Sequence, residues 1–118
     1  MLKNIYSPMG HKVGYIEDGV YISDRDFNKS QIFYRPKYRN AMGLSRIIIK
    51  QLIQNNVEKV RFRVFNFEIK MFFAEISLND FLKNAIDIKF KAKNSDYQKI
   101  VPMEYFTKVY PEQKRLDV

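Results

Sequence analysis

The sequence predicts a small α+β domain in which an antiparallel sheet packs against one longer and one shorter helix. Three observations support this fold class: an Asp-Gly hairpin near the N-terminus, alternating apolar and polar residues in two later segments, and apolar residues at helical spacing between them. The predicted order is roughly two strands, a helix, two strands, a shorter helix and one or two final strands. Such an order, with two hairpins plus one or two further strands, is typical of an α+β fold.

The first hairpin is predicted over residues 12–23, where an Asp-Gly pair supplies the turn. A two-residue type I′ turn needs positive φ at both central residues, and Asp-Gly is a preferred pair for it. This turn places Ile16 opposite Tyr21 and Tyr15 opposite Ile22, so the two strands match in hydrophobicity on each face.

A long basic and aromatic loop is predicted over residues 24–43, because this segment has no steady hydrophobic period. Pro36 limits any helix here, and Gly43 closes the segment. A short strand is predicted inside the loop at 31–34. Connections of this length inside a compact domain are uncommon and are often functional.

The longer helix is predicted over residues 45–55. Leu44, Ile48 and Leu52 recur at four-residue spacing, which places them on one helix face, and further isoleucines widen that face. The pair of asparagines that follows is a typical helix stop.

A second hairpin is predicted from alternation on both sides of a two-residue turn at 65–66. This turn pairs Val64 with Phe67 on the buried face and Arg63 with Glu68 on the other face. The predicted register leaves the face with Arg63 basic and without aromatic side chains. This argues against a sheet that stacks bases on aromatic rings.

The remaining elements are short. Ser77 begins a capping motif ahead of a helix predicted over 78–84. A half-buried strand is predicted over 86–92, and an edge strand over 98–101. We expect one domain over residues 1–118, with frayed termini at 1–10 and 111–118.

Composition narrows the function. The chain has 118 residues, no cysteine and one histidine, which excludes a disulfide framework, a thiolate zinc site and a multi-histidine metal site within one chain. No apolar run has the length of a membrane span, and the N-terminus lacks the apolar core of a signal peptide. We therefore expect a cytoplasmic, non-enzymatic protein with no cofactor and no membrane partner.

Charge gives the leading functional interpretation, which is binding of DNA or RNA mainly through phosphates. The formal net charge is +8, and a basic surplus favours a polyanionic partner. Basic and aromatic residues interleave in the long loop, where cations can neutralise phosphates and rings can stack on bases. The residues predicted to bind nucleic acid are Arg25, Lys29, Tyr34, Arg35, Lys37, Tyr38, Arg39, Arg46, Lys59, Arg61 and Arg63.

Simpler interpretations exist for each basic segment. The loop aromatics would also serve to anchor a loop to the core, and lysines on a solvated strand keep sheets soluble and discourage edge pairing. Lys89, Lys91 and Lys93 repeat the same basic alternation on a later strand.

Two alternatives belong to other functional classes. A protein interaction or self-assembly module, with a protein partner or a homo-oligomer, is favoured by 10 Phe and 8 Tyr in a short chain. A metal-dependent nuclease is suggested by Glu68 and Lys70, a carboxylate-x-lysine pattern that occurs where carboxylates hold Mg²⁺. The acidic residues Asp18, Asp24 and Asp26 would also suit a metal, but turn and cap chemistry accounts for them.

Overall fold

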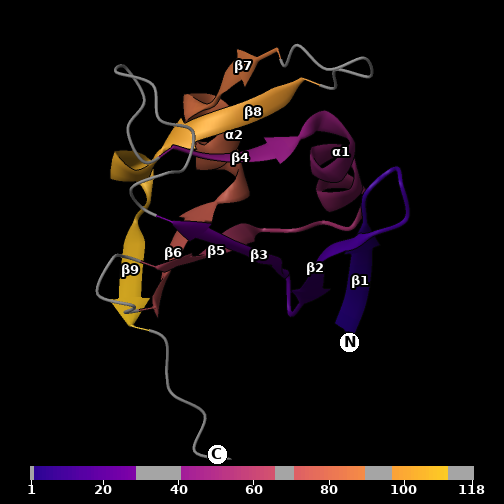
Figure 1. Cartoon of the computed structure of the whole chain (residues 1–118), viewed down its shortest axis with the longest axis horizontal. Coiled ribbons are helices and arrows are strands. Elements are labelled where there is room, and N and C mark those ends of the chain that lie inside the picture. Colours follow the sequence, from indigo (N-terminus) through magenta and orange to yellow (C-terminus); the bar gives the residue numbers. More distant parts are fainter. Residues whose placement is uncertain (1, 29–40, 66–70, 90–96, 112–118) are drawn as a thin grey trace, which may run out of the picture.

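The computed structural model describes residues 2–28, 41–65, 71–89 and 97–111, and it confirms the predicted α+β class (Figure 1). The elements in chain order are β1 (Leu2–Tyr6), β2 (Lys12–Glu17), β3 (Val20–Asn28), β4 (Ala41–Ser45), α1 (Arg46–Gln54), β5 (Lys59–Phe65), β6 (Met71–Ser77), α2 (Leu78–Asn84), β7 (Ile86–Ile88), β8 (Gln98–Pro102), the 3₁₀ turn η1 (Met103–Tyr105) and β9 (Lys108–Pro111).

The larger sheet has six strands in the order β1-β2-β3-β5-β6-β9. Its neighbouring strands are antiparallel except for β3 and β5, which are parallel. The fully antiparallel sheet predicted from the sequence is therefore wrong at this pair. The physical reason is the connection: β4 and α1 lie between β3 and β5, and such a crossover returns the chain to the end of the sheet where β3 began.

A second, three-stranded sheet has the order β4-β8-β7 and is antiparallel throughout. Both helices and this smaller sheet lie on one side of the six-stranded sheet (Figure 1). The main core fills the space between them, and it joins Phe62 of β5 to Phe81 of α2, with ring centroids 6.3 Å apart. Phe106 packs edge-on against Phe62 at 5.7 Å, which ties the chain after η1 to the same core.

The first hairpin is confirmed, including its register. Tyr15 pairs with Ile22 and Ile16 pairs with Tyr21, while Asp18 and Gly19 take the positive φ values of 50° and 78° that the turn requires. The predicted loop over 24–43 is wrong at both ends, because β3 continues to Asn28 and β4 begins at Ala41. Alternation could not reveal β4, since four of its five residues are buried.

The second hairpin is confirmed as a hairpin of β5 and β6, but its predicted register is wrong. Val64 pairs with Phe72 instead of Phe67, and Arg63 pairs with Phe73 instead of Glu68. A longer connection than two residues therefore joins the strands, and it brings Ala74 and Ile76 of β6 into the core. Residues 66–70, including Glu68 and Lys70, lie outside the described residues.

Both helices are confirmed, and each begins after a serine cap. The Ser45 hydroxyl accepts a hydrogen bond from the Ile48 amide at 3.3 Å, and the Ser77 hydroxyl accepts one from the Asp80 amide at 3.1 Å. The apolar face of α1 is narrower than predicted. Ile49 and Leu52 are buried, whereas Ile47 and Ile53 are exposed.

The predicted fraying of residues 1–10 is wrong for Leu2–Tyr6, which pair with β2 as an edge strand. The cause is Ile5, whose side chain is only 1% exposed because it joins the main core. β7 ends at Ile88, and residues 90–92 of the strand predicted over 86–92 lie outside the described residues. β8 confirms a strand at 98–101, but the predicted edge position is wrong, because β4 and β7 pair with its two sides. The predicted strand at 31–34 and the terminal residues 112–118 lie outside the described residues.

Candidate nucleic-acid interface

The predicted basic face of β5 is formed by alternate residues of a half-buried strand. Val60, Phe62 and Val64 are buried toward the helices. Their neighbours Lys59, Arg61 and Arg63 therefore lie on the opposite face, because successive side chains of a strand point to opposite sides. We call this the outer face, and no described helix or strand covers it (Figure 1).

Strand pairing places Arg61 in the middle of a row that crosses the sheet. Ile22 of β3 and Glu75 of β6 are its direct partners, and Tyr15 of β2 pairs in turn with Ile22. Adjacent strands are about 4.8 Å apart, so these side chains share one continuous surface.

Glu75 holds two of the cations on the outer face. Its side chain is only 6% exposed, and its Oε2 accepts hydrogen bonds from Nε and Nη2 of Arg61 at 3.0 and 2.8 Å. The Nζ of Lys59 lies 3.9 Å from Oε1 of the same carboxylate. A carboxylate removed from water needs such partners, so this ion cluster fixes Arg61 in place. Two cations and one carboxylate leave a net positive charge at this cluster. Arg63 follows on the same face of β5, where the strand register pairs it with Asp26 of β3.

Aromatic side chains also reach the outer face. Phe73 pairs with Arg63, and the guanidinium carbon of Arg61 lies 5.8 Å from the centre of the Phe73 ring. At the β2 end of the row, the Nζ of Lys12 lies 5.4 Å from the centre of the Tyr15 ring. The expectation of an outer face without aromatics is therefore wrong, and it failed because the predicted β5–β6 register was wrong.

Arg46 lies apart from the β5 cations, at the start of α1. Its Nη2 is 2.8 Å from Oδ2 of Asp87, and its guanidinium carbon is 4.6 Å from the centre of the Tyr97 ring. The Nζ of Lys99 lies 3.3 Å from Oδ1 of Asp87. The hydrogen bonds from Lys99 and Arg46 lower the pKa of Asp87. Arg46 thus belongs to an ion cluster of the smaller sheet.

The other predicted binding residues are distributed as follows. Arg25 lies near the end of β3 and lines a pocket between the two sheets. Six more lie outside the described residues, namely Lys29, Tyr34, Arg35, Lys37, Tyr38 and Arg39. Sequence reasoning missed Glu75 and Phe73, which only the correct register of β6 would have placed beside Arg61.

The acidic residues near the first hairpin have local roles. Asp18 occupies the turn, and the Asp24 carboxylate lies 3.4 Å from the Nζ of Lys12. Over the described ranges, no three acidic or histidine side chains gather as metal ligands. Within the same ranges, no helix is long and apolar enough to cross a membrane.

Comparison with known proteins gives no relative for this chain: no family model, curated protein or solved structure matches it.

Proposed function

We propose that this chain is a non-enzymatic nucleic-acid-binding protein that holds DNA or RNA against the outer face. The observation that carries the proposal is the arrangement of Lys59, Arg61 and Arg63 on an uncovered sheet face beside the Phe73 ring. Cations bind the phosphates, and rings provide surfaces on which bases stack.

The spacing along β5 suits a phosphate backbone. Alternate residues of a strand repeat about every 6.6 Å, so the three cations form a regular row rather than a single point of charge. Contacts of this kind release counterions from the nucleic acid, and affinity then falls steeply as salt rises. Such binding positions the strand without reading its sequence.

The aromatic neighbours favour a single strand over a duplex. Phe73 and Tyr15 are both half-buried, Tyr15 at the β2 end of the row through Arg61 and Phe73 on β6 opposite Arg63. Bases stack on protein rings only when they are not already stacked in a double helix. Arg35, Lys37 and Arg39, which the sequence predicts as phosphate contacts and which lie outside the described residues, are further proposed contacts, in keeping with the net charge of +8.

Fluorescence anisotropy with labelled single-stranded oligonucleotides tests the outer face. In Lys59→Gln, affinity should fall and the slope of log affinity against log salt should flatten by about one. Lys50→Gln is the matched control, because Lys50 is an exposed lysine on α1, on the helix side of the sheet. Equal effects of the two variants would contradict the proposed site.

Self-assembly is a second candidate, favoured by the sheet edge. β1 is the edge strand of the six-stranded sheet, and its Leu2 and Tyr6 side chains are 55% and 48% exposed. Unpaired edges pair readily with another strand. Sedimentation velocity over a wide concentration range should show a dimer that Leu2→Lys weakens. A monomer at every concentration would reject this candidate.

A further inference from the structure

Strand β1 is an edge of the six-stranded sheet, and among the described elements only β2 pairs with it (Figure 1). Every residue of β1 except Ile5 is exposed. An edge strand has backbone N–H and C=O groups that no neighbouring strand uses, and these groups pair readily with a further strand. β1 is therefore a surface at which another strand can extend the sheet.

The first hairpin determines which backbone groups of β2 point toward β1. In a hairpin with a two-residue turn, the residues that flank the turn exchange two hydrogen bonds, and such pairs alternate along the strands. Glu17 and Val20 flank the turn, so Glu17 bonds toward β3, and Tyr15 does the same two residues earlier. The alternate residues Gly14 and Ile16 therefore bond toward β1.

The register of β1 against β2 then identifies the open positions of the edge. Lys3 pairs with Ile16 and Ile5 pairs with Gly14, so Lys3 and Ile5 use their N–H and C=O groups within the sheet. The backbone groups of the alternate residues point the other way. These residues, which we call the open positions, are Leu2, Asn4 and Tyr6.

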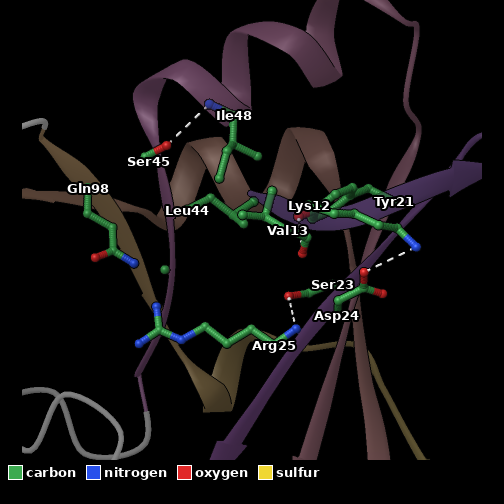
Figure 2. Close-up of a pocket in the computed structure, with 11 residues that line it drawn as sticks. Lys12, Val13, Tyr21, Ser23, Asp24, Arg25, Leu44, Ser45, Ile48 and Gln98 are labelled. Atoms are coloured by element: carbon green, nitrogen blue, oxygen red, sulfur yellow. Dashed lines mark hydrogen bonds and ion pairs between the residues drawn. The ribbon is translucent and has the colours of Figure 1, made fainter. Parts of the chain in front are cut away.

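Two side-chain hydrogen bonds agree with this assignment. The Tyr6 carbonyl accepts a hydrogen bond from Nε2 of Gln51 on α1 at 3.2 Å, which shows that it is open to a donor outside β2. On β2, the Val13 carbonyl accepts a hydrogen bond from the Tyr21 hydroxyl of β3 at 3.2 Å. Figure 2 shows these two residues together, beside the pocket between the sheets. Val13 follows the same alternation as Tyr15, so this carbonyl points toward β3 as expected.

The side chains at the open positions lie on the outer face. Ile5 is buried in the main core, so its neighbours Asn4 and Tyr6 point to the opposite side. Nδ2 of Asn4 donates a hydrogen bond to the Tyr6 hydroxyl at 3.5 Å, which places both on one face. Leu2 follows the same alternation. The open positions therefore read apolar, polar, apolar in either direction, which makes the edge complementary to itself.

We infer that two copies of this chain pair through β1, antiparallel, in a register centred on Asn4. Open positions of one strand then face open positions of the other, so every hydrogen bond across the interface has a donor and an acceptor. Asn4 faces Asn4 of the second copy, and Leu2 faces Tyr6 of the second copy on both sides of a twofold axis. The exposed side chains of Leu2 and Tyr6 thereby cover each other.

Charge and contact select this register over the two neighbouring ones that also match open positions. A register centred on Lys3 places two lysines directly opposite each other, which is unfavourable. A register centred on Ile5 leaves Leu2 without a partner. The register centred on Asn4 avoids both, because it places Lys3 opposite Ile5 and uses all three open positions.

The proposed pair joins two six-stranded sheets edge to edge. Its twofold axis runs perpendicular to the joined sheet, so both outer faces lie on the same side. Three strand spacings separate β5 from β1 in each copy, so the two basic rows lie about 34 Å apart on one surface. This inference rests on the self-assembly candidate, whose interface it specifies, and it does not depend on nucleic-acid binding.

Single-cysteine variants test the register, because the chain has no cysteine of its own. In Asn4→Cys the two thiols face each other across the axis, with Cα atoms about 5.5 Å apart, which a disulfide spans. In Leu2→Cys alone or Tyr6→Cys alone, equivalent thiols lie about 14 Å apart, which is too far for a disulfide. An equal mixture of Leu2→Cys and Tyr6→Cys brings thiols opposite each other again.

Disulfide formation under mild oxidation is followed by gel electrophoresis without reductant, with Lys50→Cys as the control for random collision at an exposed position. Asn4→Cys and the mixture should cross-link at least tenfold faster than Lys50→Cys, and Leu2→Cys or Tyr6→Cys alone should match the control. The inference is overturned if Asn4→Cys is no faster than Lys50→Cys, or if Leu2→Cys alone is as fast as the mixture. Either result, together with a dimer in sedimentation velocity, would overturn this interface and leave self-assembly through another surface.

Discussion

At the scale of single residues, Glu75 determines the electrostatic character of the outer face. It is a buried carboxylate on a strand whose outer neighbours are cations and rings, and it holds Arg61 through two hydrogen bonds. It also lies near Lys59, so it reduces the positive charge that this face presents to a phosphate. The Glu75 carboxylate therefore lowers the expected affinity for nucleic acid, while it holds the Arg61 side chain in a fixed position.

Glu75→Gln separates these two effects. Loss of the negative charge should tighten binding of single-stranded oligonucleotides several-fold and steepen the salt slope by about one. The weaker hydrogen bond to Arg61 should lower the free energy of unfolding by about 1–3 kcal/mol. Anisotropy and urea denaturation measure the two changes. A folded variant with unchanged or weaker binding would contradict a role of the outer face in binding phosphates.

Tyr21 links stability to alkaline pH. Its folded-state pKa is raised by burial, so its contribution to stability is complete below the unfolded pKa of about 10 and is lost as pH rises toward the folded pKa. Tyr21→Phe should lower the free energy of unfolding by about 1 kcal/mol at pH 8, because the bond to Val13 is lost.

Above pH 10 the difference between Tyr21→Phe and the parent should shrink, because the variant has no phenol to ionise. Urea denaturation at several pH values measures it, with Tyr105→Phe as the control at an exposed tyrosine. A constant difference across this range would contradict the account of the Tyr21 environment.

At the scale of elements, the sequence predicted correctly the helices and the hairpin whose turn, cap or spacing depends only on neighbouring residues. The Asp-Gly turn predicted the first hairpin, the spacing of apolar residues predicted α1, and the capping motif at Ser77 predicted the start of α2. β4 was missed because a strand covered on both faces has no alternation to read.

The β5–β6 register was wrong for a related reason. Strand β6 is apolar on both faces for part of its length, so more than one pairing buries apolar residues. The connection also lacks a glycine that would fix the turn. Glu75 and Phe73 depend on that register, so the charge balance and the aromatic content of the outer face could not be predicted.

The predicted basic loop has its own test. In the triple variant Arg35→Ala, Lys37→Ala, Arg39→Ala, affinity for oligonucleotides should fall by a similar factor for every sequence, and the salt slope should flatten, since phosphate contacts do not read bases. Anisotropy with several oligonucleotides of equal length measures this. Unchanged affinity would remove the loop from the binding site and leave the outer face as the site.

At the scale of the whole molecule, the six-stranded sheet separates two surfaces of different chemistry. One side carries the helices, the smaller sheet and the pocket, and the other carries the basic and aromatic outer face. The net charge of +8 was evident from composition, but its distribution was not. Asp87 and Glu75 each draw two cations into ion clusters, so charge counts alone overstate the cations open to a partner.

The most direct test of nucleic-acid binding is a salt titration of the unmodified chain with single- and double-stranded oligonucleotides of the same sequence. Between about 50 and 200 mM salt, phosphate-driven binding loses most of its affinity. We expect tight binding at low salt, a steep linear loss with log salt, and preference for the single strand because of the rings on the outer face. Absence of binding at low salt, despite the charge of +8, would contradict the proposed function.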